Sequence, residues 1–218
     1  MNPLTIGLVI AFGILAVANW VAVAPAAPDR NQVALTKVAA TLVLVAFAAL
    51  AGEMDGGART ALVVAVVACL AGDVALLGDS ERRFIAGLGS FAAGHLAYVA
   101  CALVVGVEWP RMAIAFPFLA VLFGFRFITR TIPGARREGG TVLMGAVICY
   151  AVVIAAMVAT ATGTPFWSAA VGAMLFAVSD WMIGHDKFVA PRPRARVAVM
   201  STYHAGQLLL VAGLVAAG

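Results

Sequence analysis

Two aspartates, Asp73 and Asp180, lie well inside long apolar segments of the sequence, whereas the rest of the ten acidic residues lie near or beyond the ends of such segments. A charge in a bilayer interior costs roughly 2.5–3.5 kcal/mol on insertion scales, so a carboxylate that persists there is a candidate functional group. Two carboxyl groups held in different protonation states can act as general acid and general base. We therefore predict acid–base chemistry by Asp73 and Asp180.

Further polar side chains lie in the same apolar segments and are predicted to support these carboxylates. Tyr203 and Gln207 are four residues apart, and His95 and Tyr98 are three apart, so each pair shares one face of a helix. Such groups are predicted to line one polar pocket. The predicted substrate-binding or supporting residues are Lys37, His95, Tyr98, Tyr150, Tyr203, His204 and Gln207.

The elements that position these residues are predicted to be membrane-spanning helices. Of the 218 residues, 64% are hydrophobic and only 11% are charged, and the mean hydropathy of +1.05 is far above that of a soluble domain. This composition excludes disorder and argues against a soluble enzyme. At about 20 residues per span, we predict an all-α, polytopic fold in a single transmembrane domain, residues 1–218, with eight helices at about 3–24, 33–51, 60–78, 84–106, 111–128, 140–161, 165–184 and 197–217.

The basic residues predict how this bundle is oriented. Counted along the chain, the odd-numbered loops and their flanks hold 12 of the 14 basic residues, Arg192, Arg194 and Arg196 among them, and the even-numbered loops hold only Arg59 and Arg111. By the positive-inside rule, the odd loops are cytoplasmic and both termini are not. The polar layer then lies roughly 6–10 Å below the cytoplasmic end, at about 1.5 Å per residue. We predict a multi-pass protein of the cell (inner) membrane. The basic residues sit beside spans and form no extended face, which argues against nucleic acid as a partner.

A faint internal repeat relates the two halves of the chain. Gly72-Asp73, followed by Phe84 and His95, is similar to Ser179-Asp180, followed by Phe188 and His204. Four predicted spans separate the two copies, so a true duplication gives two parallel four-helix repeats, with the two carboxylates facing each other across an axis along the membrane normal.

Structural roles and other chemistries also stay open at this level. Asp73 or Asp180 can pair with Lys37 or bond to a helix end, and His95 or Tyr150 can join two helices by one hydrogen bond. A metal site needs three or four ligands close together, and the sequence has no HExxH or CxxC spacing. We therefore predict no metal and no cofactor.

The order of these polar residues resembles the YhhN family of membrane proteins. The segment Gly72-Asp73-Val74-Ala75-Leu76-Leu77, with Phe84, Gly87, Phe91, His95 and Tyr98 after it, is similar to the central signature of that family. Ser179-Asp180, followed by Thr202-Tyr203-His204-Ala205 and Gln207, is similar to its C-terminal signature, and Lys37 and Tyr150 also match. The resemblance covers nearly the whole chain.

The animal members of this family are lysoplasmalogenases, so the resemblance implies hydrolysis of the vinyl ether bond of a lysoplasmalogen, a lysophospholipid held in the bilayer. The products are a fatty aldehyde and glycerophospho-ethanolamine or -choline. This reaction passes through an oxocarbenium ion, as glycosidases do with two carboxylates. Lys37 and the cytoplasmic arginines are candidates to bind the phosphate. The alternative is a membrane transporter of a small or lipid-like solute that uses the same buried charges.

Overall fold

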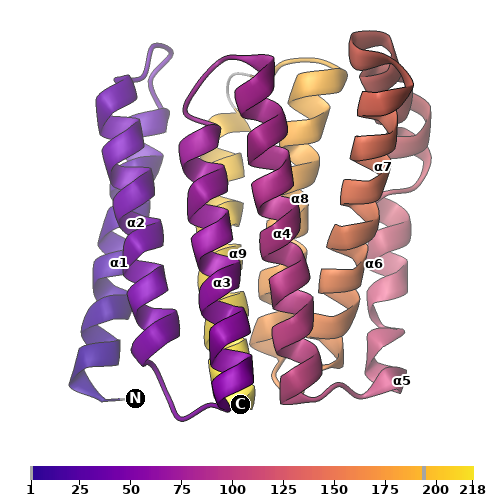
Figure 1. Ribbon diagram of the computed structural model, residues 1–218. Coiled ribbons are helices and arrows are strands. Elements are labelled where there is room, and N and C mark those ends of the chain that lie inside the picture. The colour runs from indigo at the N-terminus through magenta and orange to yellow at the C-terminus, as the bar shows by residue number, and fades with distance from the viewer. Residues whose placement is uncertain (1, 193–194) are drawn as a thin grey trace.

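The computed structural model describes residues 2–192 and 195–218, and within these residues the chain is helical throughout, with short turns between helices. Arg194, one of the basic residues counted above, lies outside the described residues. The helices are α1 (Pro3–Val23), α2 (Arg30–Leu50), α3 (Gly56–Ala75), α4 (Glu81–Val105), α5 (Trp109–Met112), α6 (Ala115–Leu122), a π-helical turn η1 (Phe127–Thr131), α7 (Ile132–Gly163), α8 (Trp167–Phe188) and α9 (Arg196–Ala217) (Figure 1).

Side-chain caps fix where the first four helices begin. The side chains of Asn2, Asp29, Asp55 and Ser80 each accept a hydrogen bond from a backbone N–H of the first turn that follows. These N–H groups have no partner inside the helix, so a polar side chain at this position stabilises the helix start. The last carbonyl groups of a helix also lack partners inside it. The Arg59 guanidinium donates hydrogen bonds to four carbonyl oxygens at and just after the end of α2.

Seven of the described helices are long and apolar enough to cross a membrane, and they correspond to seven of the eight predicted spans. Six of these agree with the prediction within about four residues at each end, whereas Phe127–Gly163 begins well before the predicted span 140–161. They are Pro3–Val23, Arg30–Leu50, Gly56–Ala75, Glu81–Val105, Phe127–Gly163, Trp167–Phe188 and Arg196–Ala217. The predicted break over residues 133–140 is shorter than expected. Ile132 to Glu138 are helical, and only Gly139 and Gly140 leave the helix, with Gly140 at φ 66°, a conformation that suits glycine.

The predicted fifth span, 111–128, is wrong as a single helix. The chain forms the short helices α5 and α6 there and then η1, which together run the height of the bundle in Figure 1. The first interruption falls at Ala113–Ile114. Pro117 explains it, because a proline ring clashes with the carbonyl group four residues earlier, here that of Ala113. The second interruption includes Gly124, which lowers helix stability further.

Close contacts between backbones hold α8 against the C-terminal helix α9. A Cβ atom on Gly172 of α8 would lie 2.2 Å from the Leu210 nitrogen, and one on Gly206 of α9 would lie 2.7 Å from the Phe176 nitrogen. Small residues at such positions let membrane helices approach closely, since packing replaces the hydrophobic effect inside a bilayer. Helix α9 also contacts α1, α2, α3 and α4, so it lies at the centre of the bundle.

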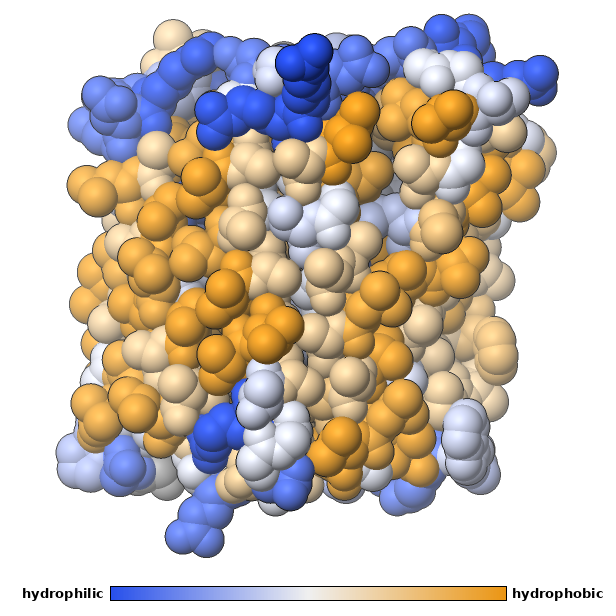
Figure 2. All heavy atoms as spheres, in the orientation of Figure 1, coloured by the Kyte–Doolittle hydropathy of each residue, from blue (hydrophilic) through white to orange (hydrophobic). Residues whose placement is uncertain are grey.

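Hydrophilic side chains gather at the two ends of the bundle, with an apolar band between them (Figure 2). Helix α1 begins and α9 ends at the same end (Figure 1), as an even number of crossings requires. The basic turns between α1 and α2 and between α3 and α4 lie at the opposite end, together with the end of α8 and the start of α9. Which end faces the cytoplasm, and whether the two halves are repeats, stay predictions.

Candidate active site

Asp180 forms a hydrogen-bonded cluster with residues of two other helices. Asp180 Oδ2 on α8 lies 2.9 Å from His95 Nε2 on α4, and it accepts a hydrogen bond of 3.0 Å from the Tyr150 hydroxyl on α7. The Tyr150 hydroxyl also lies 3.2 Å from His95 Nε2. His95 is fully buried, and the Asp180 side chain is 6% exposed. One carboxylate oxygen is thus held by two neighbours, while Asp180 Oδ1 makes no hydrogen bond within the described residues.

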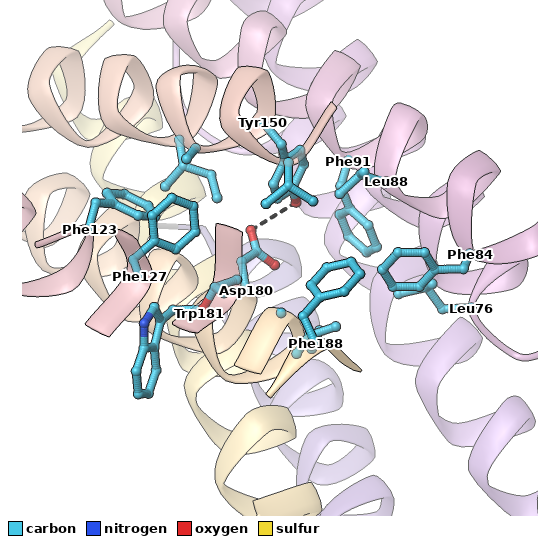
Figure 3. A pocket seen from close by; sticks show the side chains of 16 residues that line it. Leu76, Phe84, Leu88, Phe91, Phe123, Phe127, Tyr150, Asp180, Trp181 and Phe188 are labelled. Carbon is cyan, nitrogen blue, oxygen red and sulfur yellow. Dashed lines mark hydrogen bonds between the residues drawn. The ribbon is translucent and has the colours of Figure 1, made fainter. Parts of the chain in front are cut away.

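This cluster forms part of the wall of an apolar pocket with a cavity volume of about 60 Å³. Figure 3 shows the Asp180 carboxyl group between the aromatic side chains, with its hydrogen bond to Tyr150 on one side. Among the described lining residues, polar groups come from Asp180, Tyr150, Thr131 and the Trp181 indole. The other lining residues are Leu76, Phe84, Leu88, Phe91, Phe123, Phe127, Val147, Ala151, Ile154, Ile183, Gly184 and Phe188. The lining is thus apolar around one acid–base group, as in many ligand-binding pockets.

The interruption after α6 contributes to this pocket. Phe123 and Phe127, at its two sides, both line the wall, and their rings meet edge to face at 5.1 Å. Phe84 at the start of α4 and Phe188 at the end of α8 meet in the same way at 6.0 Å. Two perpendicular ring pairs therefore form part of the pocket wall, and such packing holds the rings in a defined geometry.

Asp73 forms a second cluster, deeper in the bundle. Its side chain is fully buried, and Asp73 Oδ1 lies 3.0 Å from Lys37 Nζ on α2. Asp73 Oδ2 accepts hydrogen bonds of 2.7 Å from the hydroxyl groups of Thr41 and Tyr203. One lysine charge and two hydroxyl donors thus compensate the buried carboxylate, as a buried charge requires.

Tyr203 extends the Asp73 cluster towards Tyr98. Gln207 donates to the Tyr203 hydroxyl at 3.2 Å and accepts from the Tyr98 hydroxyl. The Phe176 ring lies between this cluster and the Asp180 cluster, with its centre 5.2 Å from that of Tyr203 and 4.7 Å from that of His95. Within the described residues, no hydrogen bond joins the two aspartates. The structure thus brings Lys37, Asp73, Tyr98, Tyr203 and Gln207 into one cluster and His95, Tyr150 and Asp180 into the other.

Among the described residues, His204 makes its hydrogen bond outside both of these clusters. Its Nδ1 accepts a hydrogen bond of 3.0 Å from the Trp20 indole N–H on α1, and its ring packs edge to face against Phe12 at 5.8 Å. Sequence reasoning missed Trp20 and Thr41. The sequence could have indicated Thr41, because it lies one turn after Lys37 and so shares its helix face. Nothing in the sequence pattern indicated Trp20.

The helices and these buried clusters define a multi-pass helical membrane protein with ionisable groups inside its bundle. Within the described part of the chain, no three His, Cys, Asp or Glu side chains are grouped so as to hold a metal ion. The sequence profile of the YhhN family matches residues 32–214, and the chain therefore belongs to that family.

Several relatives carry the name lysoplasmalogenase. The human lysoplasmalogenase TMEM86B is 31% identical over 166 residues, which are 72% of this chain and 64% of the human protein. The mouse lysoplasmalogenase TMEM86B is 33% identical over 182 residues, 82% of this chain and 73% of that protein. The lysoplasmalogenase of Mycobacterium tuberculosis is 30% identical over 180 residues, 80% of this chain and 67% of that protein. The matches thus span only about two thirds of the length of these relatives. No solved structure matches the chain.

Proposed function

We propose that this protein is a hydrolase that cleaves the vinyl ether bond of a lysoplasmalogen to a fatty aldehyde and a glycerophospho-ethanolamine or -choline. The observation that carries the proposal is Asp180, a carboxyl group with one free oxygen in the wall of an apolar pocket. Such a pocket can receive the alkenyl chain and bring its first double bond to the carboxyl group. The names of the relatives support the same reaction.

The first step is transfer of a proton from the Asp180 carboxylic acid to the outer carbon of the vinyl ether double bond. The π electrons form the new C–H bond, and the carbon next to oxygen becomes an oxocarbenium ion. The Asp180 carboxylate that remains lies beside this cation and stabilises it electrostatically. Hydrogen bonds from His95 and Tyr150 to Oδ2 stabilise the carboxylate and leave Oδ1 for the transfer.

Water then adds to the oxocarbenium carbon while the carboxylate takes one of its protons, which restores the acid form of Asp180. The product is a hemiacetal. Its hydroxyl proton passes to the glycerol oxygen as the C–O bond breaks, and aldehyde and glycerophospho-headgroup leave. One water molecule is consumed and Asp180 ends as it began, so the cycle balances without a cofactor.

Asp73 is proposed to act indirectly. It does not line the pocket, and Lys37, Thr41 and Tyr203 compensate its charge. Its cluster joins α2, α3 and α9 and, through Phe176 and Tyr203, supports the packing around His95. Asp73 is thus a positioning residue in this proposal. Asp73→Asn, assayed for aldehyde release beside Asp180→Asn, tests the direct catalytic role predicted for Asp73 from the sequence.

The test is aldehyde release from lysoplasmenyl-ethanolamine and lysoplasmenyl-choline by the purified protein in detergent, followed with a coupled aldehyde dehydrogenase. Asp180→Asn is expected to lower kcat by roughly 10²-fold or more, the usual scale for a general acid. Asp79→Asn is the matched control, since the Asp79 side chain is 77% exposed and pairs with Arg30. Unchanged release by Asp180→Asn, or none from folded wild type, contradicts the proposal. In the second case, solute flux into liposomes that depends on Asp73 or Asp180 favours the transporter.

A further inference from the structure

An ion pair lies beside the pocket, at the end of the bundle where the basic turns lie. Lys187 Nζ on α8 and Glu138 Oε1 on α7 are 2.5 Å apart, with side chains 34% and 39% exposed. Lys187 Nζ also lies 5.4 Å from the ring centre of Phe84, and Phe84 packs against Phe188, both in the pocket wall. We call Lys187 and Glu138 the rim pair. Water reaches both charges, so a polar ligand can reach them too.

The rim pair stands at a suitable distance from Asp180. Lys187 follows Asp180 by seven residues, two helical turns, so both lie on one face of α8 about 10 Å apart along its axis. Long side chains in a helix lean back towards its N-terminus, which brings Lys187 Nζ closer to Asp180. In a lysoplasmalogen, five bonds separate the ether oxygen from phosphorus, roughly 6 Å when extended. A lipid with its double bond at Asp180 therefore places its phosphate near Lys187.

Glu138 is unusual in its surroundings. It is the only acidic residue between Glu108 and Asp180 in the sequence. Exposed Arg136 and Arg137 lie on its own helical turn. If this region served only to attract phosphate, an acidic side chain here would oppose it. A headgroup that carries an ammonium as well as a phosphate fits both charges of the rim pair.

We propose that the rim pair binds the zwitterionic headgroup of a lysophospholipid, with Lys187 on the phosphate and Glu138 on the ammonium of ethanolamine. The ligand exchanges one protein ion pair for two protein–ligand pairs, so no charge is left uncompensated on binding. This inference rests on the proposed function for the position of the lipid, but recognition of the headgroup can be measured without any reaction.

The experiment measures equilibrium binding of 1-O-alkyl-glycerophosphoethanolamine, whose saturated ether the proposed chemistry does not cleave, to the protein in nanodiscs of phosphatidylcholine. Lys187→Gln is expected to weaken binding at least about tenfold, the factor for one hydrogen bond between charged groups. Glu138→Gln is expected to abolish the preference for this lipid over 1-O-alkyl-glycerophosphate, which lacks the ammonium. Arg137→Gln, a matched loss of an exposed charge on the same turn, is expected to change binding less than twofold.

Each of the following outcomes overturns the inference. The first is equal binding by Lys187→Gln and wild type. The second is an equal loss in Lys187→Gln and Arg137→Gln, which indicates general attraction of the phosphate. The third is displacement of the probe by diacyl phosphatidylethanolamine added to the nanodiscs, which assigns the pair to bilayer headgroups. The double exchange Lys187→Glu with Glu138→Lys restores the ion pair, so full recovery of binding by it points to a structural role and also contradicts the inference. Headgroup-selective binding without aldehyde release contradicts only the proposed function. Aldehyde release without headgroup-selective binding contradicts only this inference.

Discussion

Lys37 Nζ on α2 lies 3.0 Å from Asp73 Oδ1 on α3, and the two side chains are only 11% and 0% exposed. Both groups lost their hydration when the bundle formed, and their attraction, together with hydrogen bonds from Thr41 and Tyr203 to Asp73 Oδ2, offsets that loss. The pair neutralises the lysine inside the bundle. Phosphate binding by Lys37, a candidate role in the sequence, would require this pair to break, whereas the rim pair is accessible already.

Breaking this pair from one side is expected to destabilise the protein strongly. Lys37→Met leaves the Asp73 charge uncompensated and is expected to cost about 3–5 kcal/mol, whereas Lys37→Met with Asp73→Leu costs less than that single change. Unfolding in mixed micelles measures both. Arg30→Met, which breaks the exposed pair with Asp79, is the control and leaves stability nearly unchanged. Additive losses in the double variant would mean that the two charges do not depend on each other.

Tyr150→Phe is expected to lower kcat for aldehyde release by roughly 10–100-fold, since a hydrogen bond to a charged group contributes about 1.5–3 kcal/mol. The ring stays in place, so KM should change little. Tyr98→Phe makes the same chemical change in the Asp73 cluster and is expected to affect stability more than kcat. An unchanged kcat in Tyr150→Phe would show that this hydroxyl does not serve the reacting carboxylate.

Ala151→Phe is expected to fill part of the pocket, because Ala151 lines it. The added ring competes with the alkyl chain, so KM should rise severalfold for long-chain substrates and less for short ones. Val152→Phe is the neighbouring control, since Val152 is 63% exposed at the outer surface. A series of lysoplasmalogens of increasing chain length measures the effect. An equal shift of KM in both variants would show that the alkyl chain does not bind in this pocket.

Gly172→Ala is expected to destabilise the contact between α8 and α9. The new Cβ would meet the backbone of Leu210 at 2.2 Å, which a side-chain rotation cannot relieve. Overpacking of this kind costs typically 1–3 kcal/mol or more. Gly145→Ala on α7 meets nothing within 4 Å and is expected to keep or raise stability. Thermal unfolding of both variants in one detergent checks the prediction, and similar melting temperatures would contradict it.

The sequence by itself determined most of the helices. Long apolar runs of about 20 residues must be helical in a bilayer, where every backbone group needs a partner, and caps such as Asp29 and Ser80 mark their starts. The family also followed from the order of the polar residues and is confirmed. The breaks in the fifth crossing were not predicted, because the effect of Pro117 and Gly124 depends on neighbours that can satisfy the freed backbone groups.

Only the tertiary structure decided which partner each ionisable group meets. A buried membrane helix is apolar on every face, so its sequence gives little sign of which face meets which neighbour. Two aspartates at similar depth therefore looked equivalent, but the bundle gives Asp73 a lysine and two hydroxyl donors and gives Asp180 a histidine, a tyrosine and a pocket. Lys187 and Glu138 are 49 residues apart in the numbering. Antiparallel spans already place both residues at one end of the bundle, but the contact between their side chains follows only from the packing of α7 against α8.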